Sequence, residues 1–407
     1  MGFAASTLPF PAIISARDAQ PVVRVIGTHV TLQEPLRLRA ERDLGIKLEF
    51  SPGGSAQVLL KASTRPQDFE IYEQWSNSIR VLWQSRAIKP IDARRIRYWD
   101  ELNPLSKTGR LSAEDTIGAG DAPNRILYAQ PDGSLDETPR EEISYLPYVH
   151  NADSIGYNPQ QVDEGEPYRE ESWGWLLAPE HAGRVAIVNA PAIGIFDLAL
   201  AARAQGLMEF ADIGAMSREE IDTLFRHMLR YKKAGHFRGF WNSVPHSAAL
   251  MLSGDVVVQS MFSPGVSIVR SGGMPCLYAA PREGYRGWHG TMCLSRHASG
   301  EREAAAYEYM NWWLSGWPGA FIARQGYYIS NPQRSRPYMS EAEWDYWYAG
   351  KPAREALRGP DGKITVQVGE QRRGGSYEKR FANISVWNTV MPNFDLTLQH
   401  WNELVVA

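Results

Sequence analysis

The chain has 407 residues, and its 43 Lys and Arg against 46 Asp and Glu give a formal net charge of −3. This near balance excludes the strongly basic surface of a nucleic-acid-binding protein, so no nucleic-acid partner is expected. No apolar run reaches the roughly 18 residues that a membrane-spanning helix needs. The length predicts at least two domains. The two cysteines, Cys276 and Cys293, are too few for a disulfide framework, and the sequence permits either one bridge or two free thiols.

The first 20 residues differ in composition from the rest of the chain. Residues 2–16 are small and apolar with two prolines, and a polar segment, RDAQ at 17–20, follows them. This pattern is typical of the end of an export signal whose basic leading part is absent. We therefore expect residues 1–20 to be an export-signal remnant or an N-terminal arm, with the signal favoured, and the protein to be periplasmic.

Short β-branched runs alternate with helical patterns along the chain, which predicts α/β layering. The clearest helix signal is a capping box, with Ser217 three residues before Glu220 and apolar residues at helical spacing after it. A second helix is expected over residues 301–314. Strands are predicted at 22–26, 48–50, 69–72, 126–128, 185–188 and 256–258.

Catalytic and cofactor motifs are missing from the sequence. It contains no G-x-S-x-G elbow, no H-E-x-x-H pair and no phosphate-binding Walker loop. The nine histidines are widely spaced, so their pattern does not indicate a metal site. We therefore expect no catalytic residues, no cofactor and no metal, and hence not an enzyme.

Several weak motifs occur in the order found in one family. They are the first strand at 22–31, DFEI at 68–71, IKPID at 88–92, YLPY at 145–148 with IGYN at 155–158, and SW at 172–173 before the strand at 185. They continue with SGDV at 253–256, PREG at 281–284 with Trp288, and GYYISN at 326–331. Together these segments resemble the extracellular solute-binding proteins of ABC importers, in particular the spermidine- and putrescine-binding proteins.

The resemblance implies a two-lobed periplasmic-binding-protein fold, in which each lobe is a mixed sheet flanked by helices and crossing strands form the hinge. Lobe 1 is expected over residues 21–147 and 287–338, and lobe 2 over residues 148–286 and 339–407. It also implies a monomer that captures a small-molecule solute between the lobes and delivers it to an ABC permease in the inner membrane. Open sheets bind ligands beyond the carboxyl ends of their strands.

Carrying the family's ligand-facing positions onto this sequence one at a time gives a candidate site. It consists of Thr28, His29, Ser55, Gln74, Trp75, His150, Asn151, Asp153, Asn189, Phe262, Ser263, Trp288, His289 and Tyr327. The rings at Trp75, Phe262, Trp288 and Tyr327 stand where polyamine binders place aromatic side chains, which suits stacking or cation–π contact.

The acidic residues of polyamine binders do not carry over. His289 and Gly290 follow Trp288 where an aspartate is usual, and Asn189 stands where paired aspartates are typical. Glu73 and Asp153 are then the only carboxylates expected near the site, too few for a dication in a dry cleft. The predicted solute is a small polar organic molecule that is neutral, zwitterionic or singly charged, with His29, His150 and His289 as possible donors to a carboxylate or hydroxyl.

Other interpretations remain open. The pair Arg372 and Arg373 could reach the cleft and add an anion contact, although a solvated surface pair is favoured. The alternative function is a spermidine or putrescine receptor that uses Glu73, Asp153 and Asp255. A metal-ion receptor using Tyr327 and Tyr328, or an enzyme on the same scaffold, is less favoured.

Overall fold

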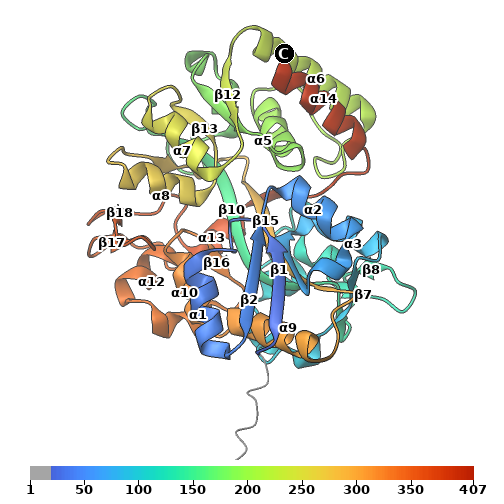
Figure 1. Ribbon diagram of the computed structural model, residues 1–407. Coiled ribbons are helices and arrows are strands. Elements are labelled where there is room, and N and C mark those ends of the chain that lie inside the picture. Colours follow the sequence, from blue (N-terminus) through green and yellow to red (C-terminus); the bar gives the residue numbers. More distant parts are fainter. Residues whose placement is uncertain (1–19) are drawn as a thin grey trace, which may run out of the picture.

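The computed structural model describes residues 20–407 (Figure 1). The predicted signal remnant or arm at 1–20 therefore lies outside the described residues, except for Gln20. Within residues 20–407 no helix is both long and apolar enough to span a bilayer.

One continuous mixed sheet runs through the molecule in the order β12-β11-β13-β10-β15-β3-β1-β2. At one end, β1 pairs in parallel with β2 and β3; at the other, β11 pairs in parallel with β12 and β13. We call the part built on the first set lobe 1 and the part built on the second set lobe 2. The strands on this path are β1 (Val22–Gly27), β2 (Lys47–Pro52), β3 (Ile71–Trp75), β10 (Leu146–Tyr157), β11 (Val185–Val188), β12 (Phe237–Trp241), β13 (Val258–Met261) and β15 (Tyr285–Ser295).

The two longest strands connect the lobes. β10 and β15 are antiparallel, and their register places Asn151 opposite Trp288 and Asp153 opposite Arg286. Both strands are buried along their whole length and pass from one lobe to the other at the centre of the molecule (Figure 1). The expected hinge crossings at 145–158 and around Trp288 are thus present. The predicted fold class, a two-lobed α/β protein, is confirmed.

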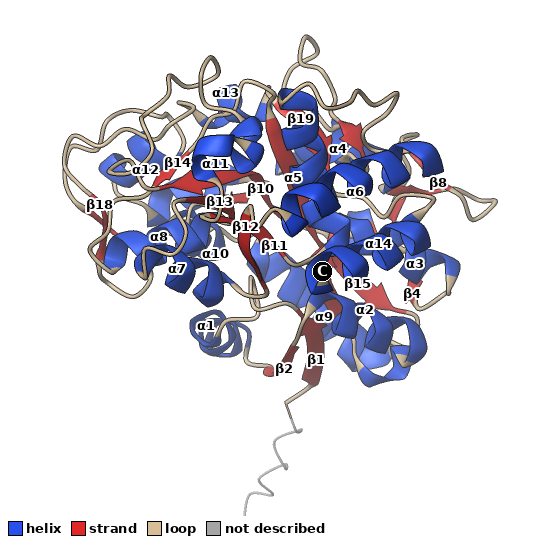
Figure 2. Cartoon of the chain, turned by 90° about the horizontal axis from the view of Figure 1, so that it is seen from above, coloured by secondary structure: helices blue, strands red, loops and turns tan. Residues whose placement is uncertain are grey.

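Helices flank the sheet in both lobes (Figures 1 and 2). The predicted capping box opens α6, because Ser217 Oγ accepts the Glu220 amide and the Glu220 side chain accepts the Ser217 amide. The helix predicted at 301–314 is α9, which begins one residue earlier. The helices are α1 (Glu34–Leu44), α2 (Ser55–Thr64), α3 (Ile79–Gln84), α4 (Pro104–Thr108), α5 (Pro191–Ala204), α6 (Arg218–Lys233), α7 (Val244–Leu252), α8 (Ser263–Ser271), α9 (Gly300–Trp313), α10 (Trp317–Ala323), α11 (Pro332–Ser335), α12 (Glu341–Trp347), α13 (Tyr377–Phe381) and α14 (Phe394–Val406).

Short strands complete the architecture. They are β4 (Ile88–Lys89), β5 (Ile91–Asp92), β6 (Ala119–Gly120), β7 (Tyr128–Ala129), β8 (Leu135–Asp136), β9 (Glu142–Ile143), β14 (Leu277–Tyr278), β16 (Tyr328–Ile329), β17 (Leu357–Arg358), β18 (Ile364–Val366) and β19 (Ile384–Trp387). The strand predicted at 126–128 is wrong for its first two residues, where a 3-10 turn at Pro123–Ile126 leads into the two-residue β7. The strand predicted at 256–258 begins only at Val258.

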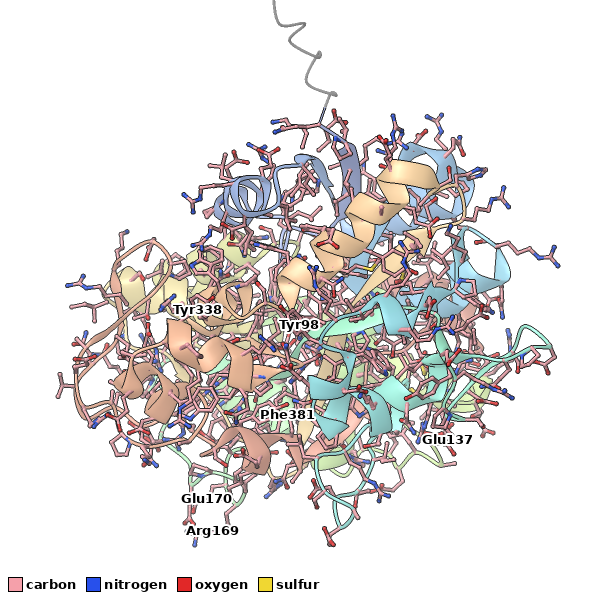
Figure 3. The ribbon with its side chains drawn as sticks, turned by 90° about the horizontal axis from the view of Figure 1, so that it is seen from below. Tyr98, Glu137, Arg169, Glu170, Tyr338 and Phe381 are labelled. Atoms are coloured by element: carbon pink, nitrogen blue, oxygen red, sulfur yellow. The ribbon has the colours of Figure 1, made fainter. Side chains whose placement is uncertain are left out.

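Separate hydrophobic cores support the two lobes. In lobe 1 the core lies among β1, β3, α1 and α9, and in lobe 2 it lies among β11, α5, α6 and α14. A third cluster joins α12, α13 and β19 to Ala152, Tyr285 and Tyr328 on or beside the crossing strands. Phe381 of this cluster is labelled near the middle of the underside in Figure 3. The lobe boundaries at 147, 286 and 338 stay predictions, since the sheet is continuous.

Both cysteines are free thiols. Cys276 packs in a small cluster between α7 and α8, and Cys293 lies in the lobe 1 core. Each is buried, which raises its thiol pKa to about 12. Of the two possibilities left open by the sequence, the structure has two free thiols.

Candidate ligand-binding cleft

A narrow cleft lies where the two lobes face each other beside the crossing strands. Lobe 1 contributes residues at the ends of β1 and β3 and from the loop before β16, and lobe 2 contributes residues from α5 and the start of α8. The crossing strands provide its floor. The lining residues are Val30, Trp75, Asp153, Ile193, Phe262, Trp288, Tyr327 and Asn388.

Aromatic rings form most of the cleft wall. Trp75 ends β3 in lobe 1, and its ring centroid lies 6.4 Å from that of Phe262, which precedes α8 in lobe 2. Trp241 supports Phe262 from behind with an edge contact at 5.0 Å. Trp288 and Tyr327 meet edge to face at 5.3 Å. Rings from both lobes thus enclose the space, and their faces suit stacking or cation–π contact.

Gly326 allows Tyr327 to reach the cleft. Its φ is +82°, in the left-handed region that favours glycine, and a Cβ at this position would collide with Ser263 Oγ. The loop before β16 therefore packs directly on the first residue of α8. This contact is one of the places where lobe 1 and lobe 2 touch.

Asp153 is the cleft's carboxylate and belongs to a fully buried ionic group. Arg286 Nη1 lies 3.5 Å from Asp153 Oδ2, and Arg286 Nε lies 2.6 Å from Asp197 Oδ1. Arg286 Nη1 also donates to Asn388 Oδ1 at 3.2 Å. Tyr278 OH and Asn151 Nδ2 donate to Asp153 Oδ1 at 3.1 and 3.0 Å. One guanidinium therefore faces two carboxylates, which leaves one surplus negative charge when both are ionised.

Burial shifts the titration of this group. It raises the pKa of Asp153 to about 6, although Arg286 acts in the opposite direction. The pKa of Asp197 is also raised by burial, again against the opposing effect of Arg286. At neutral pH Asp153 is therefore mostly ionised, but its pKa lies only about one unit lower. A ligand cation would stabilise the ionised form further.

Glu73 lies deeper than the sequence suggested. Its side chain is fully buried within lobe 1, Tyr148 OH donates to its Oε2 at 3.1 Å, and it does not line the cleft. Desolvation raises its pKa to about 7. Among residues 20–407, Asp153 is thus the one carboxylate that lines the cleft.

The structure brings five of the fourteen predicted site residues to the cleft: Trp75, Asp153, Phe262, Trp288 and Tyr327. It places the other nine elsewhere. Thr28 is buried after β1, and His29 is exposed. Four of the others make side-chain hydrogen bonds: Ser55 with Gln74, Asn151 with Asp153, and Asn189 with Asn242 and Trp401. Ser263 lines a second cavity. That any of these residues binds a ligand stays a prediction.

The histidines that were candidate donors do not line the cleft. His150 Nε2 pairs with Tyr377 OH at 2.8 Å, and its ring packs against Phe381. His289 lies between Tyr145 and Trp387, with ring centroids 5.3 and 5.9 Å away. Desolvation lowers the pKa of both histidines to about 3, so they are neutral at physiological pH.

Sequence reasoning missed five residues of the cleft and its ionic group: Val30, Ile193, Asn388, Arg286 and Asp197. Arg286 lies two residues before Trp288, so strand alternation places both on one face of β15. That spacing could have flagged Arg286. Asp197 is the one charged residue among the buried residues of α5, where a buried charge requires a partner.

The preferred interpretation of Arg372 and Arg373 as a solvated surface pair is wrong. Arg372 is 8 % exposed, and its Nη2 donates to Gly326 O at 3.1 Å. Arg373 pairs with Glu171 at 2.5 Å. Neither lines the cleft; both line the second cavity.

Comparison with solved structures identifies the fold. The Treponema pallidum lipoprotein TpPotD superposes with a TM-score of 0.66 at 12% identity, covering 95% of this chain and 100% of that chain. The chain has the two-lobed fold of ABC-importer solute-binding proteins. The spermidine/putrescine ABC transporter substrate-binding protein PotD from Streptococcus pneumoniae gives a TM-score of 0.61 at 13% identity, covering 95% and 100%.

A third solved structure shows the same fold. The binding protein MotA from A. tumefaciens, solved in complex with glucopine, gives a TM-score of 0.59 at 10% identity and covers 94% of this chain and 99% of that chain. No family model and no curated protein sequence matches the chain. At these identities the likeness establishes the fold, and the ligand has to be argued from the residues of the cleft.

Among the residues that the structure describes, no group of three or more His, Cys, Asp or Glu side chains is arranged to hold a metal ion. Tyr328, which a metal-receptor interpretation would need beside Tyr327, instead donates to Trp347 O at 3.1 Å. Its ring packs against Tyr377, Tyr348 and Phe381.

Proposed function

We propose that this protein is the solute-binding component of an ABC importer and that it captures a small polar organic solute carrying at most one positive charge. The observation that carries the proposal is the cleft itself, where four aromatic rings from two lobes surround one carboxylate, Asp153. The fold shared with importer solute-binding proteins supports the transport role.

The charge balance argues for the ligand class. Arg286 already compensates one of the two carboxylates, Asp153 and Asp197, so the cleft offers one surplus negative charge. A single ammonium or quaternary amine held against Trp75 or Trp288 would meet this charge and the ring faces together. The second ammonium of a polyamine would find no carboxylate lining the cleft, because Glu73 is buried behind Tyr148.

Capture would depend on both lobes. Trp75 and Phe262 approach from opposite lobes, and β10 with β15 form the hinge between them. A solute between these rings would stabilise the closed arrangement, which a permease can sense. The proposal includes export to the periplasm, a monomeric receptor, and delivery to a permease in the inner membrane.

A thermal-shift screen of the purified protein tests the ligand class. The panel contains polyamines, amino acids and betaines, sugars, organic acids, phosphonates and metal ions. A ligand at a hundred times its Kd adds about 2.7 kcal/mol to stability and should raise the melting temperature by a few degrees. We expect the shift from amino acids or betaines, and none from spermidine or putrescine.

Variants sharpen the screen. Trp75→Ala should reduce the shift to about half or less, whereas Trp83→Ala, which removes a half-buried tryptophan of the same lobe outside the cleft, should keep it. A shift from spermidine that depends on Trp75 would replace our ligand class with the polyamine alternative. No Trp75-dependent shift with any class would contradict solute capture in this cleft.

A further inference from the structure

A second, small cavity with about 30 Å³ of free space lies between α8 of lobe 2 and the segment that carries α12, β18 and residues 371–373. It shares no lining residue with the ligand cleft. Phe262 faces the cleft and the next residue, Ser263, faces this cavity, so the start of α8 separates the two. Figure 1 shows α8 beside β17, β18 and α12 on the same flank of the molecule.

The lining of this cavity is basic. Its lining residues within the described part of the chain include three guanidinium groups, Arg270, Arg372 and Arg373, and no carboxylate. Two of them are neutralised from outside the lining: Arg270 pairs with Glu370, and Arg373 pairs with Glu171 at 2.5 Å. Arg372, in contrast, has no carboxylate partner among the described residues.

Arg372 is a buried cation without a counter-charge. Its donors reach only neutral oxygens: Tyr328 OH, Trp347 O at 3.4 Å and Gly326 O at 3.1 Å. Its guanidinium lies between the rings of Tyr328 and Trp347, at 4.9 and 5.1 Å from their centroids. Within residues 20–407 no carboxylate comes within ion-pair distance of it.

A second uncompensated guanidinium lies nearby. Arg380 is fully buried, donates to Arg373 O at 2.9 Å and to Ala152 O at 3.0 Å, and makes no ion pair in the described part of the chain. Its charge lowers the pKa of Arg372, adding to the larger effect of burial. Two buried positive charges with no anion are costly, since each uncompensated buried ion costs several kcal/mol.

The cavity also offers free neutral donors. Thr365 is 5 % exposed, lines the cavity, and its Oγ1 has no hydrogen-bond partner. Ser263 and Ser267 line the opposite wall from the first turns of α8, whose N-terminus favours negative charge. Guanidinium, hydroxyl and helix N-terminus together are the donors that oxyanions use in proteins.

We propose that this second cavity binds a small oxyanion, a phosphate, sulfate or carboxylate group, with Arg372 as its charge partner and Thr365 and the α8 serines as further donors. The anion would compensate Arg372 and link α8 of lobe 2 to the segment that packs around the hinge. Its binding is separate from solute capture, because no residue lines both cavities.

Thermal denaturation and titration calorimetry test this with inorganic phosphate, sulfate and acetate, each compared with chloride at equal ionic strength. We expect at least one of the three oxyanions to raise the melting temperature by about 3 °C or more at saturation. Which of the three anions gives the largest shift shows whether the cavity prefers a tetrahedral anion or a carboxylate. The shift should persist in Trp75→Ala, whose cleft is altered.

Variants locate the site. Arg372→Gln should abolish the oxyanion-specific shift, and Thr365→Val, a near-isosteric change, should weaken binding several-fold. Arg358→Gln removes an exposed charge from β17 next to β18 and should leave the shift unchanged. If Arg372→Gln does not fold, the oxyanion shift of Thr365→Val still tests whether the anion binds in this cavity. The proposal is overturned if no oxyanion stabilises the wild type beyond chloride, or if the shift is undiminished in Thr365→Val and in folded Arg372→Gln.

Discussion

Trp75 and Phe262 lie 6.4 Å apart between ring centroids, with their planes tilted by 55°, and they come from different lobes. Trp75 also packs against the lobe 2 cluster around Trp241 and Ile193. The same tryptophan therefore belongs to the ligand cleft and to the contact between the lobes. A change at this position should affect binding and closure together.

Replacing Trp75 by Ala should weaken binding of the solute that gives the largest thermal shift by about 10-fold to 100-fold. Lost stacking or cation–π energy contributes about 0.5–2 kcal/mol, and lost apolar contact adds to it. Titration calorimetry measures the change. Trp83→Ala serves as the control, and an equal loss of affinity in both variants would contradict the assignment of Trp75 to the cleft.

Affinity for a solute with one positive charge should depend on pH through Asp153. Its pKa in the free protein is raised to about 6, so the carboxylate gains a proton as the pH falls through that value. Affinity should therefore fall between about pH 7 and pH 5, and calorimetry over this range measures the decline. Asp153→Asn should bind at least about tenfold more weakly at pH 7 and show no such decline.

The pH series has an internal check. A solute without net positive charge should show a smaller pH dependence in the wild type, because ionised Asp153 would no longer meet an unpaired cation. If Asp153→Asn keeps the full affinity for a cationic solute at pH 7, the carboxylate does not contribute to recognition.

The positions of the main strands along the chain and the hinge crossings could be predicted because collinear motifs mark them. YLPY at 145–148 and IGYN at 155–158 lie on the single strand β10, and the capping box at Ser217 opens α6 where the side-chain pattern placed it. The segment at 126–128 was misjudged because three apolar residues do not distinguish a strand from a buried 3-10 turn.

The cleft was less predictable than the fold. Positions at strand ends, such as Trp75 and Phe262, followed from topology, since strand ends face the crevice between lobes. His150 and His289 share β10 and β15 with true lining residues, but the pleat turns successive side chains to opposite faces of the sheet. Asn388 and Asp197 come from segments with no family motif, so only tertiary packing brings them to the ionic group.

Glu73 should make the protein less stable as the pH rises from about 4.5 to about 7. Its pKa is raised by burial to about 7, so over this range the native state holds a proton that the unfolded chain has released. Because the native state then binds more protons, its free energy of unfolding falls with rising pH and the loss is complete above about pH 7.

Glu73→Gln should remove this dependence. At pH 8 the variant should be more stable than the wild type by about 2–3 kcal/mol, since it no longer buries an ionised carboxylate and its amide oxygen can still accept from Tyr148. At pH 4 the two should be nearly equal. Urea unfolding at both values measures the difference, and Glu49→Gln, an exposed change on β2, should show no such pattern.

Arg286 should be the costliest charge to remove. It lies between Asp153 and Asp197, and all three side chains are fully buried. Arg286→Met would leave two buried carboxylates without a counter-charge, so we expect a loss of about 3–5 kcal/mol in the free energy of unfolding at pH 7. Denaturant unfolding measures it, and Arg97→Met, which breaks the exposed pair with Glu308, should cost less than about 1 kcal/mol.

The double variant Arg286→Met with Asp197→Asn distinguishes charge from packing. If the loss in Arg286→Met comes from uncompensated carboxylates, removing the charge of Asp197 should restore part of the stability. Lowering the pH should restore more as Asp153 gains a proton, and it should do so at a higher pH than beside Arg286, whose charge lowers the pKa of Asp153. A double variant as unstable as the sum of its single variants, at every pH, would show that Arg286 acts through packing. In that case Arg286 would not act by compensating Asp153 and Asp197, and the single surplus negative charge inferred for the cleft would lose its support.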